Sequence, residues 1–112
     1  MLDDLVDCAS CDRRRLPQGL RLARRTPTFT SRTTPAALRQ AHRTTVWAEL
    51  VVTAGSVQFR DEDPSQPWAT TAGAGQRVTI VPERPHAVTP STDARFHVRF
   101  YSPVLVPVAA TT

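Results

Sequence analysis

The sequence predicts an all-β domain. Short runs rich in Val, Thr and aromatic residues recur along the chain, and Pro, Gly, Asp or Ser bounds each of them. In the run 94–101, Phe96, Val98 and Phe100 alternate with basic residues, which is the period of a half-buried strand. No stretch shows the periodicity of a long amphipathic helix. Runs spaced in this way are typical of a β-sandwich or a small antiparallel barrel.

The length of 112 residues is that of a single domain. Residues 1–18 show mixed charge without a strand period, so we expect a loosely ordered N-terminal arm there. The domain itself is expected over 19–103, and 104–112 form a C-terminal tail.

The individual strands follow from the turn residues between them. The clearest strand covers 46–53 and is predicted to form a hairpin with 56–60, because Gly55 can take the positive φ of a tight turn. The polar loop 61–67 holds two prolines and is predicted to be a surface connection. Leu38 to His42 is expected to form either one helical turn or an edge strand. Further strands are expected over 68–71, 76–81, 86–89 and 94–101.

Charge and hydropathy limit the classes of partner. The net charge of +4 comes from 14 basic residues, all of them Arg. Acidic residues lie close to the N-terminal arginines, and this region has no interleaved aromatic residues and no DNA-binding motif. No nucleic-acid partner is therefore expected. No run reaches the roughly 20 apolar residues that span a bilayer, and the N-terminus is acidic where a signal peptide is basic. We therefore expect a cytoplasmic protein with no membrane association.

Cys8 and Cys11 form a Cys-x-x-Cys pair. Such a pair serves redox exchange when it follows a βαβ pattern, or zinc binding when two more ligands lie nearby. Neither context is present, so we interpret the pair as an incidental or regulatory thiol pair in the arm.

Two histidines are the candidate metal ligands. His42 precedes the first clear strand and His86 follows a Pro-x-x-Pro bend, and a barrel would bring both to its mouth. Neutral imidazole is a good ligand for Zn, Fe, Ni or Cu, but a stable centre normally needs a third protein ligand. The candidates for that ligand are Glu49 and His97. No motif of the common hydrolases, nucleotide-binding proteins or zinc proteases occurs, and the catalytic residues stay unknown.

A set of short motifs occurs in a fixed order between about Leu20 and Pro103. They are Arg25-Thr26-Pro27-Thr28-Phe29, His42-Arg43-Thr44, Val46-Trp47, Gly55, Ala72-Gly73, Val81-Pro82-Glu83, Pro85-His86-Ala87-Val88 and Arg95-Phe96-His97-Val98-Arg99-Phe100-Tyr101. In this order they resemble the TehB/YeaR-like family, which is associated with tellurite resistance and with nitrate or nitrosative stress. The resemblance implies a cupin-like double-stranded β-helix, and it matches His42 and His86 to family histidines.

Three functions are consistent with these observations. The first is a small cupin-type stress-response module that binds a metal ion, an oxyanion or another small ligand in the barrel mouth through His42 and His86. The alternative is a metal-dependent enzyme of the oxygenase or isomerase type acting on a small substrate. The third is an interaction domain that pairs with a copy of itself, and a homodimer is expected here only by analogy with other cupin-like domains.

Overall fold

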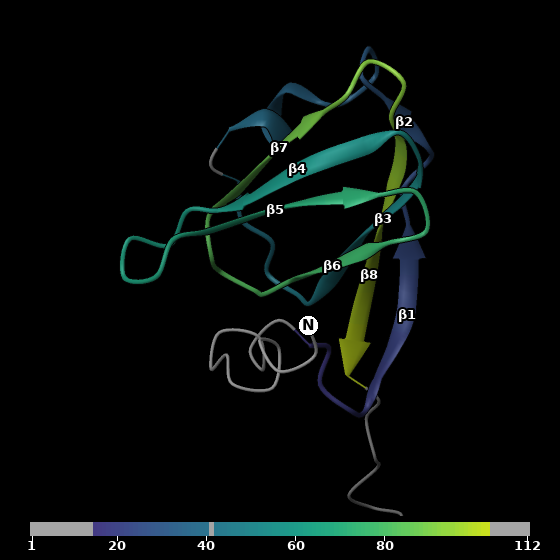
Figure 1. Cartoon of the computed structure of the whole chain (residues 1–112). Coiled ribbons are helices and arrows are strands. Elements are labelled where there is room, and N and C mark those ends of the chain that lie inside the picture. The colour runs from purple at the N-terminus through teal and green to yellow at the C-terminus, as the bar shows by residue number, and fades with distance from the viewer. Residues whose placement is uncertain (1–14, 41, 104–112) are drawn as a thin grey trace, which may run out of the picture.

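The computed structural model describes residues 15–40 and 42–103, and these form two antiparallel β-sheets and a single 3-10 helix (Figure 1). The elements are β1 (Leu20–Arg25), β2 (Phe29–Thr30), η1 (Ala36–Arg39), β3 (Ala48–Ala54), β4 (Ser56–Asp61), β5 (Trp68–Gly73), β6 (Arg77–Ile80), β7 (His86–Pro90) and β8 (Arg95–Pro103). The first sheet has the order β1-β8-β3-β6, with β2 also paired to β8, and the second has the order β5-β4-β7. The predicted all-β class is confirmed.

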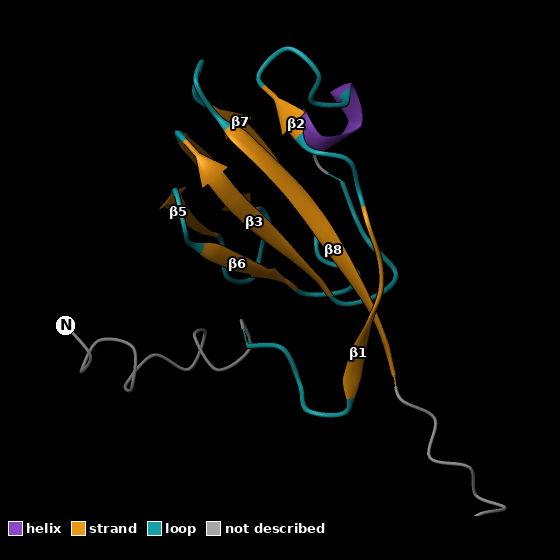
Figure 2. Cartoon of the chain, turned by 90° about the vertical axis from the view of Figure 1, so that its right-hand side faces the viewer, coloured by secondary structure: helices purple, strands orange, loops and turns teal. Residues whose placement is uncertain are grey.

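The expected small antiparallel barrel is not confirmed, because the strands form two separate sheets that do not close into a barrel. Figure 2 shows β8, β3 and β6 side by side in the first sheet, with strands of the second sheet behind them. The strand that follows β6 in the chain is β7, and it pairs with β4 in the other sheet. Pro82 and Pro85 lie between β6 and β7, and because proline has no N–H, neither residue can donate a ladder hydrogen bond in this connection. A cupin double-stranded β-helix is therefore not confirmed.

The predicted hairpin between 46–53 and 56–60 is also wrong. The strands β3 and β4 form there, but β3 pairs with β6 and β8, whereas β4 pairs with β5 and β7. Only Gly55 lies between them, which is shorter than the two-residue loop of the tightest common hairpin. Gly55 has a φ of +62°, as predicted for a turn, and carries the chain from one sheet to the other. The hairpin of the second sheet is formed instead by β4 and β5.

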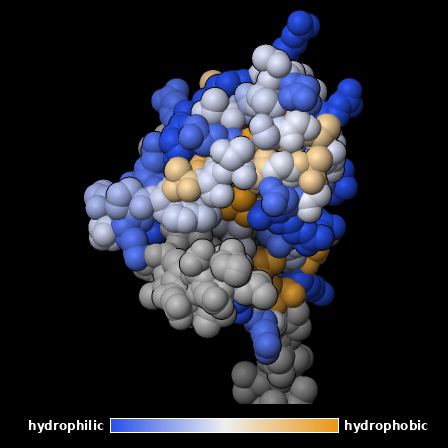
Figure 3. Space-filling model, viewed as in Figure 1, coloured by the Kyte–Doolittle hydropathy of each residue, from blue (hydrophilic) through white to orange (hydrophobic). Residues whose placement is uncertain are grey.

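The hydrophobic core lies between the sheets, because alternate side chains of both sheets point toward each other. In β3 these are Ala48, Leu50 and Val52, all of them buried. Other core residues are Val57, Phe59, Ala72, Val78, Ile80, Val88, Ala94, Phe96 and Val98. On the face that Figure 3 shows, hydrophilic residues predominate and apolar ones form small separate areas, as expected when the apolar residues face inward.

The segment before β3 follows the helical alternative in part. A 3-10 helix covers Ala36–Arg39, slightly earlier than expected, and His42 forms an isolated β-bridge.

No helix among the described residues has the length and apolar character needed to cross a membrane. Cys8, Cys11 and the predicted tail 104–112 lie outside the described residues.

Candidate functional site

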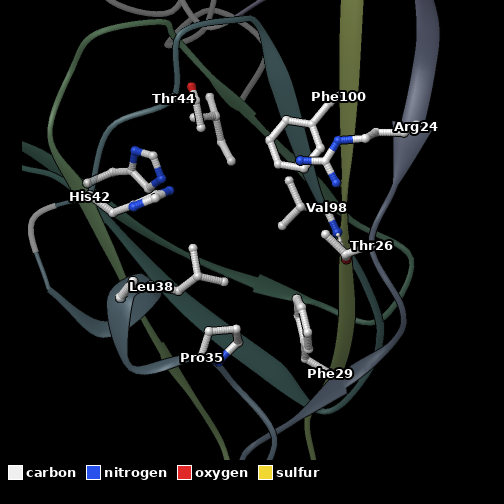
Figure 4. Close-up of a pocket in the computed structure, with 12 residues that line it drawn as sticks. Arg24, Thr26, Phe29, Pro35, Leu38, His42, Thr44, Val98 and Phe100 are labelled. Carbon is white, nitrogen blue, oxygen red and sulfur yellow. Dashed lines mark hydrogen bonds between the residues drawn. The ribbon is translucent and has the colours of Figure 1, made fainter.

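A cavity of about 220 Å³ lies between the first sheet, β7 and the 3-10 helix (Figure 4). Its lining consists mainly of apolar side chains, with two histidines and one arginine among them. The lining residues are Arg24, Thr26, Phe29, Pro35, Ala37, Leu38, His42, Thr44, Ile80, His86, Val98 and Phe100.

The structure brings the two predicted histidines together in this cavity. The N–H of His42 donates to the carbonyl of His86 and the N–H of His86 donates to the carbonyl of His42, each at 2.8 Å. Their ring centroids are 5.4 Å apart and the ring planes are nearly perpendicular, at 89°. The two imidazoles are therefore placed by a main-chain bridge and not only by side-chain packing.

His86 is buried and held in a defined tautomer. Its side chain is packed against Phe59, with ring centroids 5.5 Å apart, and the residue is 2% exposed. Nδ1 lies 3.2 Å from the carbonyl oxygen of Arg84, and because a carbonyl only accepts, Nδ1 carries the proton. Burial lowers the pKa of His86, outweighing the Arg84 carbonyl, which raises it, and nearby His42 lowers it further. The ring is therefore neutral at pH 7, and Nε2 is a hydrogen-bond acceptor.

Arg24 supplies the positive charge of the cavity. Its guanidinium carbon lies 4.4 Å from the centre of the Phe100 ring, its cross-strand neighbour in β8. Arg24 has no carboxylate partner among the described residues, and no Asp or Glu contributes to the cavity wall. In Figure 4, Arg24 and Phe100 face His42 from the opposite side of the cavity.

Neither candidate for a third metal ligand reaches the two histidines. Glu49 and His97 occupy strand positions that alternate with the core residues of β3 and β8, so both side chains project from the outer face of the first sheet. Glu49 Oε1 accepts a hydrogen bond of 2.5 Å from the Tyr101 hydroxyl and lies 3.5 Å from Arg77 Nη1. The interpretation of either residue as a partner of His42 and His86 is therefore wrong.

The residues that the structure describes do not complete a metal centre. Within the described ranges, no group of three or more His, Cys, Asp or Glu side chains is placed to hold a metal ion. Zinc sites in proteins use three protein ligands when catalytic and four when structural. The pair His42 and His86 supplies two nitrogen ligands, so no step of a mechanism is assigned to a metal.

His97 lies in a positively charged environment on the outer face. The residue is 6% exposed, and its Nδ1 is buried without a hydrogen-bond partner. Burial lowers the pKa of His97, and the positive charges of Arg25, Arg99 and Arg77 lower it further.

A second cavity of about 470 Å³ adjoins the first. The two share Arg24, His42, Thr44 and Phe100 in their walls. The second also includes polar residues that the first lacks, namely Arg43, Thr45 and Ser102. The sequence did not assign Arg24 or Phe100 to the site of the two histidines: Phe100 belongs to the alternating strand pattern, and Arg24 directly precedes the first of the ordered motifs.

Comparisons with known proteins agree with this architecture. A family model described as the TehB-like domain matches residues 24–98, a range that includes both histidines and Arg24. A crystal structure of a protein from Escherichia coli strain K12 is 26% identical, with a TM-score of 0.74, and the match covers 83% of this chain and 91% of that one.

The crystal structure of TehB from Haemophilus influenzae is 20% identical, with a TM-score of 0.69 over 77% of this chain, and at this identity it supports the fold alone. The match covers 32% of the TehB chain, so the described domain corresponds to about a third of that protein. No curated protein matches.

Proposed function

The chain belongs to the TehB-like domain family, and on this premise we propose that it is a small-ligand-binding module whose site is the cavity at His42 and His86. The family's association with tellurite resistance makes a stress-response role part of the proposal. The module acts by binding, and catalysis is not required.

The observation that carries the proposal is the charge of the cavity. Arg24 stands in a mainly apolar wall that contains no carboxylate, so a negatively charged ligand would supply the counter-charge that the described residues do not give to Arg24. Pockets for drug-sized ligands are roughly 300–1,000 Å³. A cavity of about 220 Å³ therefore suits an anionic ligand that is smaller than a drug-sized molecule.

The two histidines give the site its polar inner wall. His86 is neutral and presents Nε2 as an acceptor, so it can receive a hydrogen bond from a hydroxyl, an amide or a protonated acid. The main-chain bridge holds the backbones of the two histidines together, which limits the separations that the rings can adopt and reduces the entropy lost when a ligand contacts both.

A metal-dependent enzyme is the second candidate function, and one observation favours it. The hydrogen bond between His86 Nδ1 and the Arg84 carbonyl resembles the arrangement that orients metal-ligating histidines. A metal bound at Nε2 could polarise a substrate or activate water. The ligands beyond the two imidazoles would have to come from the substrate, from water or from residues outside the described ranges.

Two measurements on the full chain test these functions. The first is elemental analysis of untagged protein purified without chelator, compared with a His42→Ala, His86→Ala double variant whose fold is checked by circular dichroism. Metal near one equivalent that is lost in the variant would support the metal-dependent candidate. Negligible metal in both proteins would leave the metal-free binding module as the proposal.

The second measurement is titration with phosphate, nitrate, tellurite and a panel of small carboxylates, followed by NMR chemical shifts. We expect saturable shifts at cavity residues for at least one anion, and weaker binding in Arg24→Gln. The exposed Arg95 lies outside the cavity, so Arg95→Gln is the matched control with the same loss of charge. If every probe leaves the cavity resonances unchanged, the ligand-binding proposal is wrong.

A further inference from the structure

We propose that the ligand is a small amphipathic organic acid, with its apolar body in the inner cavity and its carboxylate between Arg24 and Arg43 at the outer one. This inference rests on the proposed function and goes beyond it by naming the ligand class and its orientation. The terms inner and outer cavity denote the cavities of about 220 Å³ and 470 Å³.

The inner cavity is poorly suited to a bare inorganic ion. Its hydroxyl groups already make hydrogen bonds to the main chain: Thr26 Oγ1 donates to the Pro27 carbonyl and accepts from the Val98 N–H, and Thr44 Oγ1 donates to the Val46 carbonyl. Most of the remaining wall is aliphatic or aromatic. An oxyanion that entered fully would lose its hydration without gaining enough donors, whereas an apolar group gains from leaving water.

The outer cavity has the complementary character. It adds Arg43 to the shared Arg24, together with hydroxyl side chains, and Arg43 is exposed and has no carboxylate partner among the described residues. A guanidinium group binds a carboxylate through two parallel hydrogen bonds. The charged end of a ligand is therefore expected at the outer cavity, where it can also keep part of its hydration.

The shared residues connect the two environments. Arg24, His42, Thr44 and Phe100 belong to both cavities, so one ligand can contact Arg24 while its body passes Phe100 toward His86. Stacking on Phe100 limits the conformations of the Arg24 side chain before binding. The aromatic and branched residues of the inner wall, Phe29, Leu38, Ile80 and Val98, favour an aryl or branched body.

The experiment is calorimetric and NMR titration of the full chain with phenylacetate, 3-methylbutanoate, acetate, inorganic phosphate and the uncharged phenylacetamide. We expect phenylacetate or 3-methylbutanoate to bind about tenfold more tightly than acetate, because the apolar body is buried. Arg24→Gln and Arg43→Gln should each lower the affinity for the carboxylates about tenfold, since a charge-assisted hydrogen bond is lost, and should leave the affinity for phenylacetamide unchanged. Arg95→Gln should change neither affinity.

Two further readouts test the orientation. Leu38 lies half-buried in the 3-10 helix and is not one of the buried core residues. Leu38→Phe should therefore narrow the inner cavity and lower the affinity for the acid and for the amide alike. The NMR-measured pKa of His86 should stay the same when the acid binds. A rise in that pKa would place the carboxylate at the histidines and overturn the proposed orientation.

The outcomes separate this inference from the proposed function. If phosphate or acetate binds at the cavity as tightly as the larger acids, the apolar body contributes nothing; the inference is then wrong and the binding function remains. If none of the organic acids and no inorganic anion binds, both are wrong. Binding of acid and amide with equal affinity would overturn the role assigned to Arg24 and Arg43.

Discussion

His42 and His86 are joined through their main chains, each donating its N–H to the carbonyl of the other at 2.8 Å. A substitution of either side chain removes neither a donor nor an acceptor of these two hydrogen bonds. The path of the chain at the cavity therefore does not depend on the imidazoles, which makes histidine variants suitable tests of ligand binding.

The two histidines should differ in their effect on stability. His86→Ala removes a side chain that is 2% exposed and packed on Phe59, so we expect the free energy of unfolding to fall by about 1–3 kcal/mol. His42 is only half-buried, so His42→Ala should cost less. Urea unfolding of both variants measures the difference, and an equal or larger loss for His42→Ala would contradict the packing assigned to His86.

The stability of the fold should decrease as the pH falls below 6.5. The folded-state pKa of His86 lies below its usual value of 6.5, so the unfolded state binds the proton more readily. The contribution of neutral His86 to the free energy of unfolding is complete above pH 6.5. It declines as the pH falls through that value and is lost below the folded-state pKa. His97, whose pKa is lowered as well, acts in the same direction.

The test is a series of urea unfolding curves between about pH 8 and pH 5.5, a window chosen around the usual histidine pKa. His86→Gln should flatten the pH dependence, and His86→Gln combined with His97→Gln should flatten it further. A slope that is unchanged in the double variant would assign the pH dependence to other groups.

Gly55 and Gly75 offer a matched pair for backbone strain. Both have positive φ, +62° and +86°, but a Cβ at Gly55 would lie 2.6 Å from Asp93 Oδ1 and 2.7 Å from the Ala94 main chain, whereas one at Gly75 meets nothing within 4 Å. Gly75→Ala should cost about 1–2 kcal/mol from the left-handed conformation alone. Gly55→Ala should cost more, because main-chain atoms must also move, and thermal unfolding of both variants would show the order.

Substitutions on the outer face of the first sheet should leave the cavity intact. Glu49 and His97 project away from it, so Glu49→Gln and His97→Gln should bind any cavity ligand with unchanged affinity. Glu49→Gln should instead lower the pKa of Tyr101, which burial and the hydrogen bond to Glu49 raise. Ligand titration and a spectroscopic titration of Tyr101 measure the two effects, and weaker ligand binding in either variant would contradict this separation of faces.

The sequence predicted the strands better than their pairing. The runs 46–53, 56–60 and 94–101 correspond to β3, β4 and β8, because period-2 patterns and turn residues are local signals. The hairpin was wrong and the barrel is not confirmed, because the choice of strand partners depends on long-range contacts, such as that between β3 and β8. The predicted runs leave two residues, Ala54 and Gly55, between them, which is the length of a tight hairpin loop, and only the structure shows that β3 continues to Ala54 and that Gly55 alone connects it to β4.

The candidate site was predicted in part. The position of His42 and His86 beside turns, together with the family resemblance, indicated that they lie together, and the structure places them so. Glu49 was chosen for its type and distance along the chain, but the alternation of β3 assigns it to the face opposite Leu50. Arg24 could not be assigned from the sequence, since only the pairing of β1 with β8 brings it onto Phe100.

The central place of β8 has a consequence for synthesis on the ribosome. β8 is the last of the described strands and pairs with β1, β2 and β3, whereas β4, β5 and β7 complete the second sheet earlier in the chain. A nascent chain that has reached Pro90 contains every strand of the second sheet, but the first still lacks the strand that joins three of its members. The cavity can therefore assemble only after translation has passed Phe100. Until then β8 is not available to cover the apolar face of the second sheet.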